Sequence, residues 1–149
     1  MDTAPFTLEV WIRLQTADAV YRHLFTKDNG ASIGREGYDV VIQQDQIFFQ
    51  RYVGGKQLLA GVGNSSLLNT WAHVVSTYDG QLLRLYVDGK ELARKADARP
   101  QLSKSTSFVI GMNNGTDGPV LADVDEVAIY DKALTPERIT AHYLRGAGP

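Results

Sequence analysis

The stretch from Asn69 to Ala96 reads NTWAHVVSTYDGQLLRLYVDGKELARKA and contains two Asp-Gly pairs, Asp79-Gly80 and Asp88-Gly89. Each pair closes a run of apolar and aromatic residues in which alternate side chains share one face. Asp-Gly is a strong turn signal because glycine takes positive φ freely and aspartate tolerates it while bonding its own backbone. The stretch therefore predicts antiparallel strands joined by hairpins, with both aspartates as turn residues and neither as a catalytic group.

Similar alternating runs recur along most of the chain. From Phe6 to Leu14 every second residue is apolar, which is typical of a strand with one buried face. Further runs begin at Tyr38, Gln46, Trp71, Leu82, Ser107 and Val124. Their number and spacing favour a β-sandwich or barrel over a fold in which strands and helices alternate.

Helical periodicity is convincing only near the carboxyl end, from Leu134 to Gly146. Thr135 is a good N-cap, and Pro136 fits the first helical position. Leu134 and Ile139 occupy the positions of a hydrophobic staple. The sequence therefore predicts one short helix that ends at Gly146 and lies on the sandwich as a lid.

Length and composition exclude several classes of function. A chain of 149 residues is the size of one domain, and the absence of cysteine excludes disulfides and thiolate metal sites. With 15 basic and 17 acidic residues the formal charge is -2, which disfavours nucleic acid as a partner. No apolar run approaches the length of a membrane span, and the amino terminus lacks the pattern of a secretory signal.

Three blocks of the sequence resemble a known family. FTLEVWIRL from Phe6, TWAHVVSTYDGQLLRLYVDGKELA from Thr70 and IGMNNGTDGPVLADVDEVAIYDKALTPERITAHY from Ile110 are similar to laminin G-like domains of the concanavalin A-like lectin/glucanase fold. The blocks occur in the family's order and cover nearly the whole chain. The resemblance implies an all-β, antiparallel jelly-roll β-sandwich that forms a single domain over residues 1–149.

The resemblance also exposes a departure at the amino terminus. Members of the family usually have another strand before the first block, and here only Met1 to Pro5 precede it. Proline cannot donate to a β-ladder, so this leader is a poor substitute strand. A missing strand leaves an unpaired sheet edge. We therefore expect the domain to self-associate, or to dock on a strand-completing partner, through this edge.

The sequence ADVDEV contains the candidate metal ligands Asp123 and Asp125. Strict alternation places Asp125 on the same face as Val127 and Ile129, pointing toward the core, where an unpaired charge is costly. Calcium takes hard oxygen ligands, and the resemblance implies a structural calcium with an aspartate near this block. The alternative is an aspartate that accepts hydrogen bonds from the amides of an adjacent turn.

Catalysis is not favoured. The glucanases of this fold carry a Glu-x-Asp-x-x-Glu strand signature, which DVDEV does not match, and Glu9 has no second carboxylate within its own strand. His23, His73 and His142 show no metal-ligand spacing and no arrangement of nucleophile and base. The sequence therefore predicts a protein that is not an enzyme.

Two loops rich in Asn, Asp and Gly remain as candidate ligand sites. Turn chemistry explains them adequately. A sugar or calcium site at the rim is the alternative, with amide and carboxylate groups bonding hydroxyls and an aromatic ring stacking on the sugar. Its candidate ligand-binding residues are Asn113, Asn114, Asp117 and Tyr38.

These observations favour a non-catalytic recognition or adhesion module of lectin type. Its expected ligand is a glycan or a protein surface, and it is expected outside a cell or on the surface of a particle. The alternative is a structural or decoration component that docks on a multimeric assembly without binding sugar.

Overall fold

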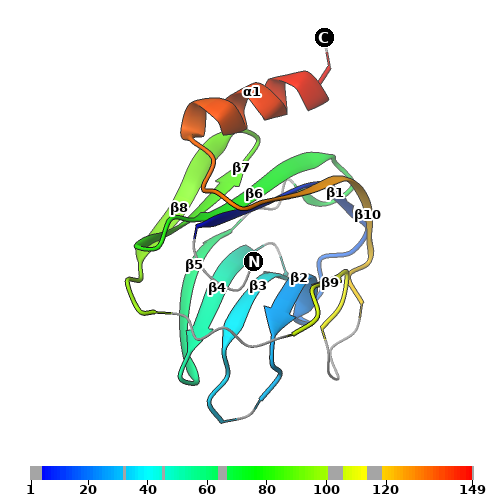
Figure 1. Ribbon diagram of the computed structural model, residues 1–149. Coiled ribbons are helices and arrows are strands. Elements are labelled where there is room, and N and C mark those ends of the chain that lie inside the picture. Colours follow the sequence, from blue (N-terminus) through cyan, green and yellow to red (C-terminus); the bar gives the residue numbers. More distant parts are fainter. Residues whose placement is uncertain are drawn as a thin grey trace.

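The computed structural model describes residues 5–31, 33–44, 46–63, 67–100, 106–113 and 119–148, which fold into two antiparallel sheets packed face to face (Figure 1). Sheet A has the strand order β10 (Ala122–Tyr130), β1 (Phe6–Leu14), β6 (Ala72–Tyr78), β7 (Leu82–Val87), β8 (Lys90–Ala96). Sheet B has the order β5 (Lys56–Gly63), β4 (Gln46–Val53), β3 (Gly37–Gln43), β2 (Arg22–Asp28), β9 (Val109–Ile110). The predicted all-β jelly-roll sandwich is confirmed.

The core lies between the two sheets and is built by alternation along the strands. On β1 the inward side chains are at most 2% exposed: Phe6, Leu8, Val10, Ile12, Leu14. The Phe6 ring stacks on Tyr38 of β3 with a centroid distance of 4.3 Å and meets Phe49 of β4 edge-on at 6.1 Å. Each large apolar side chain buried in this way contributes roughly 1.5–3 kcal/mol to folding.

One charged side chain also points between the sheets. Arg51 of β4 is 0% exposed, and its Nη1 donates to Asp97 Oδ2 at 2.8 Å. Its guanidinium carbon lies 4.0 Å from the centroid of the Tyr78 ring on sheet A. The pair and the ring contact satisfy a charge that would otherwise be costly to bury.

The two Asp-Gly pairs form the turns that flank β7. Asp88 and Gly89 have φ of 50° and 75°, and the flanking Val87 and Lys90 are paired, which defines a two-residue hairpin of type I′. At the other turn, Asp79 Oδ1 accepts hydrogen bonds from the amides of residues 81 and 82, both at 2.8 Å. Both predicted turns are confirmed.

Helix α1 (Pro136–Gly146) lies on the outer face of sheet A (Figure 1). Thr135 caps it by accepting from the amide of Arg138. Leu134 and Ile139 pack with two outward side chains of sheet A, Val75 and Tyr86. The predicted cap, staple and helix end at Gly146 are confirmed.

The two sides of the sandwich differ. On one side β5 and β8 lie next to each other, whereas β9 and β10 are the sheet edges on the other side (Figure 1). Val124 and Ile129 of β10 pair with the fully buried Ile12 and Leu8, yet they are 36% and 41% exposed. The inner face of β10 is therefore only partly covered by the described residues.

Candidate functional site

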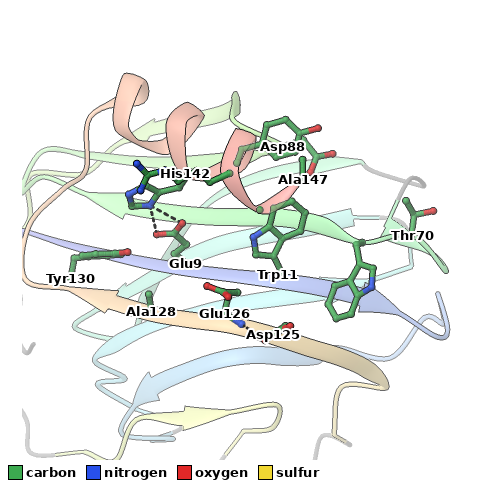
Figure 2. Close-up of a pocket in the computed structure, with 14 residues that line it drawn as sticks. Glu9, Trp11, Thr70, Asp88, Asp125, Glu126, Ala128, Tyr130, His142 and Ala147 are labelled. Carbon is green, nitrogen blue, oxygen red and sulfur yellow. Dashed lines mark hydrogen bonds and ion pairs between the residues drawn. The ribbon is translucent and has the colours of Figure 1, made fainter. Parts of the chain in front are cut away.

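A pocket of about 930 Å³ lies on the outer face of sheet A, between β1, β10 and the carboxyl end of α1. Strand β1 contributes Glu9 and Trp11, which alternate with its buried residues and so point outward. The remaining walls come from four other parts of the chain: Thr70 and Trp71 before β6, Asp88 in the turn between β7 and β8, outward residues of β10 between Asp125 and Tyr130, and residues of α1 and its carboxyl end between His142 and Ala147. Figure 2 shows these side chains converging above the sheet.

A β-bulge in β10 shapes one wall of this pocket. Trp11 pairs with Asp125 and Glu9 pairs with Ala128, so two residues of β10 stand opposite one residue of β1. The extra residue is Glu126, whose φ is 52°. Because a bulge shifts the alternation by one residue, Asp125 lies on the outer face although Ile129 lies on the inner face.

The floor of the pocket holds a hydrogen-bonded carboxylate, Glu9, which is 6% exposed. Its oxygens accept from His73 Nε2 at 2.7 Å and from His142 Nδ1 at 2.9 and 3.0 Å. Burial by itself would raise the pKa of Glu9, but the hydrogen bonds from His73, His142 and Tyr130 together lower it below its ordinary value. Glu9 is therefore an ionised acceptor that ties β6 and α1 to β1.

Trp11 is fixed by its neighbours. Its ring stacks on Tyr143 of α1 at 5.9 Å with an interplanar angle of 21°, and it lies 5.2 Å from the His73 ring. Gly146 comes so close that a Cβ there would lie 2.5 Å from Trp11 Cζ2. The absence of a side chain at Gly146 thus lets the end of the helix rest on the indole.

The second indole is more open. Trp71 is 39% exposed, and the Arg13 guanidinium lies 5.3 Å from its ring centroid. The chain has two tryptophans, and both line this pocket. Indole rings and carboxylates around one concave surface are the combination that binds sugar rings or cations.

A carboxylate and two imidazoles meet at the floor of the pocket. A histidine held by a carboxylate is a general-base arrangement, but it needs a nucleophile within hydrogen-bond reach. In the described part of the chain, the hydrogen bonds of His142 go to Glu9 and none goes to a Ser or Thr hydroxyl. The cluster therefore joins structural elements.

The two predicted calcium ligands have different partners in the structure. Asp123 is bound by Arg13, whose Nε and Nη2 donate to Oδ2 at 2.9 and 2.8 Å. Asp125 is exposed on the outer face, and its Oδ1 accepts from the amide of Glu126 at 2.8 Å. The expectation that Asp125 points toward the core is wrong because of the bulge. Within the described residues, no group of three or more His, Asp or Glu is arranged to hold a metal ion.

Of the predicted ligand-binding residues that the structure describes, Tyr38 and Asn113 do not line the pocket. Tyr38 is 0% exposed in the core, so its ring has no face on which a sugar could stack. Asn113 lies near sheet B, where its Nδ2 is 3.5 Å from His23 Nε2. Asn114 and Asp117 fall outside the described residues.

Sequence reasoning missed most of the pocket. Glu9 and Trp11 were visible as outward positions of the first strand, and this alternation was the one available signal. The Asp-Gly pattern predicts only a turn at Asp88, but Asp88 also lines the pocket, and its Oδ1 accepts from the amide of His73 at 2.9 Å. His142 reaches the site only because α1 folds back over sheet A.

The outer face of sheet B carries a second charged cluster, whose two carboxyl groups are shielded from solvent. Asp28 and Asp39 are 2% and 0% exposed, and both contact Arg35 from the segment that joins β2 to β3. Arg35 Nη2 lies 3.0 Å from Asp39 Oδ2, and its guanidinium carbon stands 3.9 Å from the centroid of the Tyr52 ring. Gln50 Nε2 also donates to Asp39 at 3.2 Å.

Two carboxyl groups share one guanidinium in this cluster, and their pKa values move apart. Burial and the neighbouring Asp28 raise the pKa of Asp39 to about 8, against the opposing effect of Arg35. Burial also acts to raise the pKa of Asp28, but the hydrogen bond from Arg35 outweighs it and the pKa is lowered. One proton is therefore retained by the pair at neutral pH.

Comparison with known proteins shows the family. The model described as the concanavalin A-like lectin/glucanases superfamily, of laminin G type, matches residues 1–140. The chain therefore belongs to this superfamily and has a laminin G-like domain. No helix in the described residues has the length and apolar character needed to cross a membrane.

Among curated proteins, Pappalysin-1 of Mus musculus and Pappalysin-1 of Homo sapiens are each 30% identical to this chain over 104 residues. The match covers 62% of this chain and 6% of theirs. The chain thus spans a small fraction of the length of these relatives.

Solved structures resemble the whole fold. The binding domain of botulinum neurotoxin serotype G superposes with a TM-score of 0.81 at 15% identity, covering 98% of this chain and 37% of that one. The binding domain of Paraclostridial Mosquitocidal Protein 1 gives a TM-score of 0.77 at 14% identity, covering 97% and 38%. At these identities the likeness concerns the fold.

Proposed function

We propose that the protein is a non-catalytic recognition module that binds a carbohydrate in the pocket between β1, β10 and α1. The observation that carries this proposal is that both tryptophans of the chain line one pocket of about 930 Å³ together with several carboxylates. Membership of a superfamily that contains lectins supports it. We place the module outside a cell or on the surface of a particle, where glycans are displayed.

The pocket offers both parts of a sugar site. An indole provides a flat apolar surface for the C–H face of a pyranose ring, and Trp71 keeps 39% of its surface exposed. The carboxylates of Asp125 and Glu126 stand on the opposite wall and can accept hydrogen bonds from ring hydroxyls. A few polar groups on an otherwise fixed surface give orientation as well as affinity.

Hydrolysis is not part of the proposal. A glycosidase needs one carboxyl group that keeps its proton near neutral pH and a second that is ionised. The pKa of Glu9 is lowered, and its oxygens are occupied by two imidazole N–H groups. The raised pKa of Asp39 belongs to the opposite sheet, where its side chain is fully buried.

A glycan array, run with and without calcium, tests this function directly. Hits should then be titrated by tryptophan fluorescence, which reports on the pocket because both indoles line it. Trp71→Ala should weaken binding about tenfold or more, as expected for a central aromatic contact. The matched control is Leu92→Ala, which removes an apolar side chain that is 43% exposed on β8, away from the pocket. Equal binding by the Trp71→Ala variant would place the ligand elsewhere.

A second function, docking as a structural component of an assembly, is favoured by the edge of sheet A. The inner-face residues Val124, Val127 and Ile129 of β10 are 36%, 38% and 41% exposed. Among the described strands β10 pairs with β1 alone, so its other edge offers backbone groups to an added strand. A strand from a partner chain or from a second copy would cover these side chains and complete the ladder.

Hydrogen exchange along residues 123–130 distinguishes this alternative. Amides on the free edge should exchange quickly in a dilute monomer and become protected when the protein self-associates or docks. Sedimentation velocity on the same samples gives the oligomeric state. A dilute monomer in which all these amides are strongly protected would rule out docking through this edge.

A further inference from the structure

The pocket has an excess of negative charge that bears on its ligand. Its lining contains one guanidinium, Arg145, and four carboxylates: Glu9, Asp88, Asp125, Glu126. Glu9 is already matched by the N–H groups of two imidazoles. The other three carboxylates are half-buried or exposed, so a ligand in the pocket would meet their charge.

Each of these three carboxylates keeps accepting capacity. One oxygen of Asp88 and one of Asp125 accept from backbone amides, at 2.9 and 2.8 Å. In the described part of the chain, neither is in an ion pair, and the Glu126 carboxylate has no side-chain partner. By contrast, the neighbouring Asp123 is already neutralised by Arg13.

These carboxylates surround an aromatic surface. Figure 2 shows the Trp11 indole between Asp88 on the helix side and the pair Asp125 and Glu126 on the β10 side. A cation near an indole face is attracted by the ring quadrupole, and carboxylates within reach add to that attraction. The protein already makes such a contact beside the pocket, where the guanidinium of Arg13 lies over Trp71.

From this arrangement we infer that the ligand is an amino sugar with a free ammonium group, bound by Asp125 and Glu126 beside the Trp11 and Trp71 indoles. The inference rests on the proposed carbohydrate-binding function and names the class of sugar. The sugar ring would stack on the indoles. Its hydroxyls would donate hydrogen bonds to the remaining carboxylate oxygens. Sulfated or carboxylated glycans are disfavoured, because three unneutralised carboxylates repel them.

The experiment compares three soluble probes by tryptophan fluorescence at low salt: a glucosamine tetramer, an N-acetylglucosamine tetramer and a capped tetralysine peptide. The first two have the same sugar backbone and differ in the ammonium charge. We expect the glucosamine tetramer to bind about tenfold or more tightly than either of the others. Its affinity should fall as salt is raised from about 50 to 500 mM, because the carboxylates are partly exposed.

Isosteric variants test whether the carboxylates of the pocket are the groups that attract the ammonium charge of the ligand. Glu126→Gln should weaken binding of the glucosamine tetramer about three- to fivefold, and the double variant Asp125→Asn with Glu126→Gln about tenfold or more. Asp131→Asn is the matched control, because it removes the same charge from an exposed position outside the pocket. It should leave affinity unchanged, and far-ultraviolet circular dichroism should show all variants folded.

The outcomes separate the inference from the proposed function. The ammonium inference would be overturned if the N-acetylglucosamine and glucosamine tetramers bound equally well and Glu126→Gln changed neither affinity. The proposed sugar site would still hold in that case. Equal binding of the tetralysine peptide would overturn the assignment to a sugar. Binding to no probe here and to no glycan on the array would reject the proposed function together with the inference.

Discussion

The two outer faces of the sandwich carry similar side chains but differ in whether the protein itself supplies partners for their charged groups. On sheet B the charged groups are closed by the protein itself, since Arg35 folds over Tyr52 and contacts both Asp28 and Asp39. On sheet A the carboxylates Asp125 and Glu126 face an open pocket beside two indoles. Carboxyl groups next to aromatic rings are therefore enclosed by the fold on one face and are accessible to a ligand on the other.

The most strongly shifted carboxyl pKa and the proposed ligand site lie on different faces of the sandwich. The pKa of Asp39 is raised to about 8 in a cluster where its side chain is fully buried. Perturbed carboxyl groups often mark functional sites, but buried ion-pair networks produce the same shifts. The pocket on sheet A is instead proposed because its carboxylates are accessible and keep free hydrogen-bond acceptors.

The largest expected effect comes from removing the cation of the closed face. Arg35→Ala leaves two buried carboxyl groups without a counter-charge, so we expect the free energy of unfolding to fall by about 2–4 kcal/mol in urea titrations. Arg145→Ala is the matched change in the open pocket and should cost about 0.5 kcal/mol or less. Similar losses for the two variants would remove the distinction between the faces.

The second prediction concerns the pH dependence of stability. Because the pKa of Asp39 is raised from 3.8 to about 8, the folded protein keeps a proton that the unfolded chain has lost in this range. Asp39 therefore makes stability fall as the pH rises from about 4 to 8. Asp28 acts in the opposite sense, because its lowered pKa gives stability that is lost as the pH falls below about 4.

Asp39→Asn removes the first of these contributions. We expect the stability of the variant relative to the native chain, measured by urea unfolding, to rise between pH 5 and pH 8 by up to about 1.4 kcal/mol per pH unit. Comparing the two proteins at each pH cancels the titration of histidines distant from Asp39. The His23 ring, with Nδ1 3.7 Å from Asp39 Oδ2, is the exception, so the same pair should be measured in a His23→Gln background. A difference that is the same at both pH values would contradict the raised pKa.

The third prediction sharpens the role of the turn aspartates. Asp79→Ala and Asp88→Ala should each cost about 1 kcal/mol, the first by losing side-chain bonds to backbone amides and the second because alanine disfavours a φ of 50°. Only Asp88 lines the pocket, so ligand affinity should fall for Asp88→Ala and stay unchanged for Asp79→Ala. A loss of affinity in both would indicate a general effect on the sheet.

The smallest expected effect is that of calcium on Asp123 and Asp125, which remains a prediction. Arg13 already neutralises Asp123, so any ion held with Asp125 should bind weakly. At about 1 mM calcium and a millimolar dissociation constant, the stabilisation is below about 0.5 kcal/mol. Differential scanning calorimetry with chelator and with calcium measures it, and Asp125→Asn should abolish the response. A shift of several degrees would show a stronger site than this geometry supports.

Individual residues show how far sequence reasoning reached. The alternation of β1 predicted its buried face, and Thr135 with Pro136 predicted the start of α1, because both signals are local. Strict alternation failed on β10 because Glu126 bulges, and a bulge depends on pairing with a partner strand. Alternation along β4 places Arg51 on the same face as the buried Ile47 and Phe49, but it gave no sign of the partner Asp97, which is distant in the chain.

By itself, the sequence determined most of the strands, the Asp-Gly turns, the capped helix and the family, because hydrophobic period and turn chemistry act between near neighbours. It did not indicate β2 or β5. Only the tertiary structure decided which side chains meet. Glu9, His73 and His142 come from three elements, and Trp11 and Asp125 face each other only in the register of β1 with β10. The same packing closed Asp39 beneath Arg35 and left the carboxylates of the pocket open, because exposure depends on the elements that fold over each face.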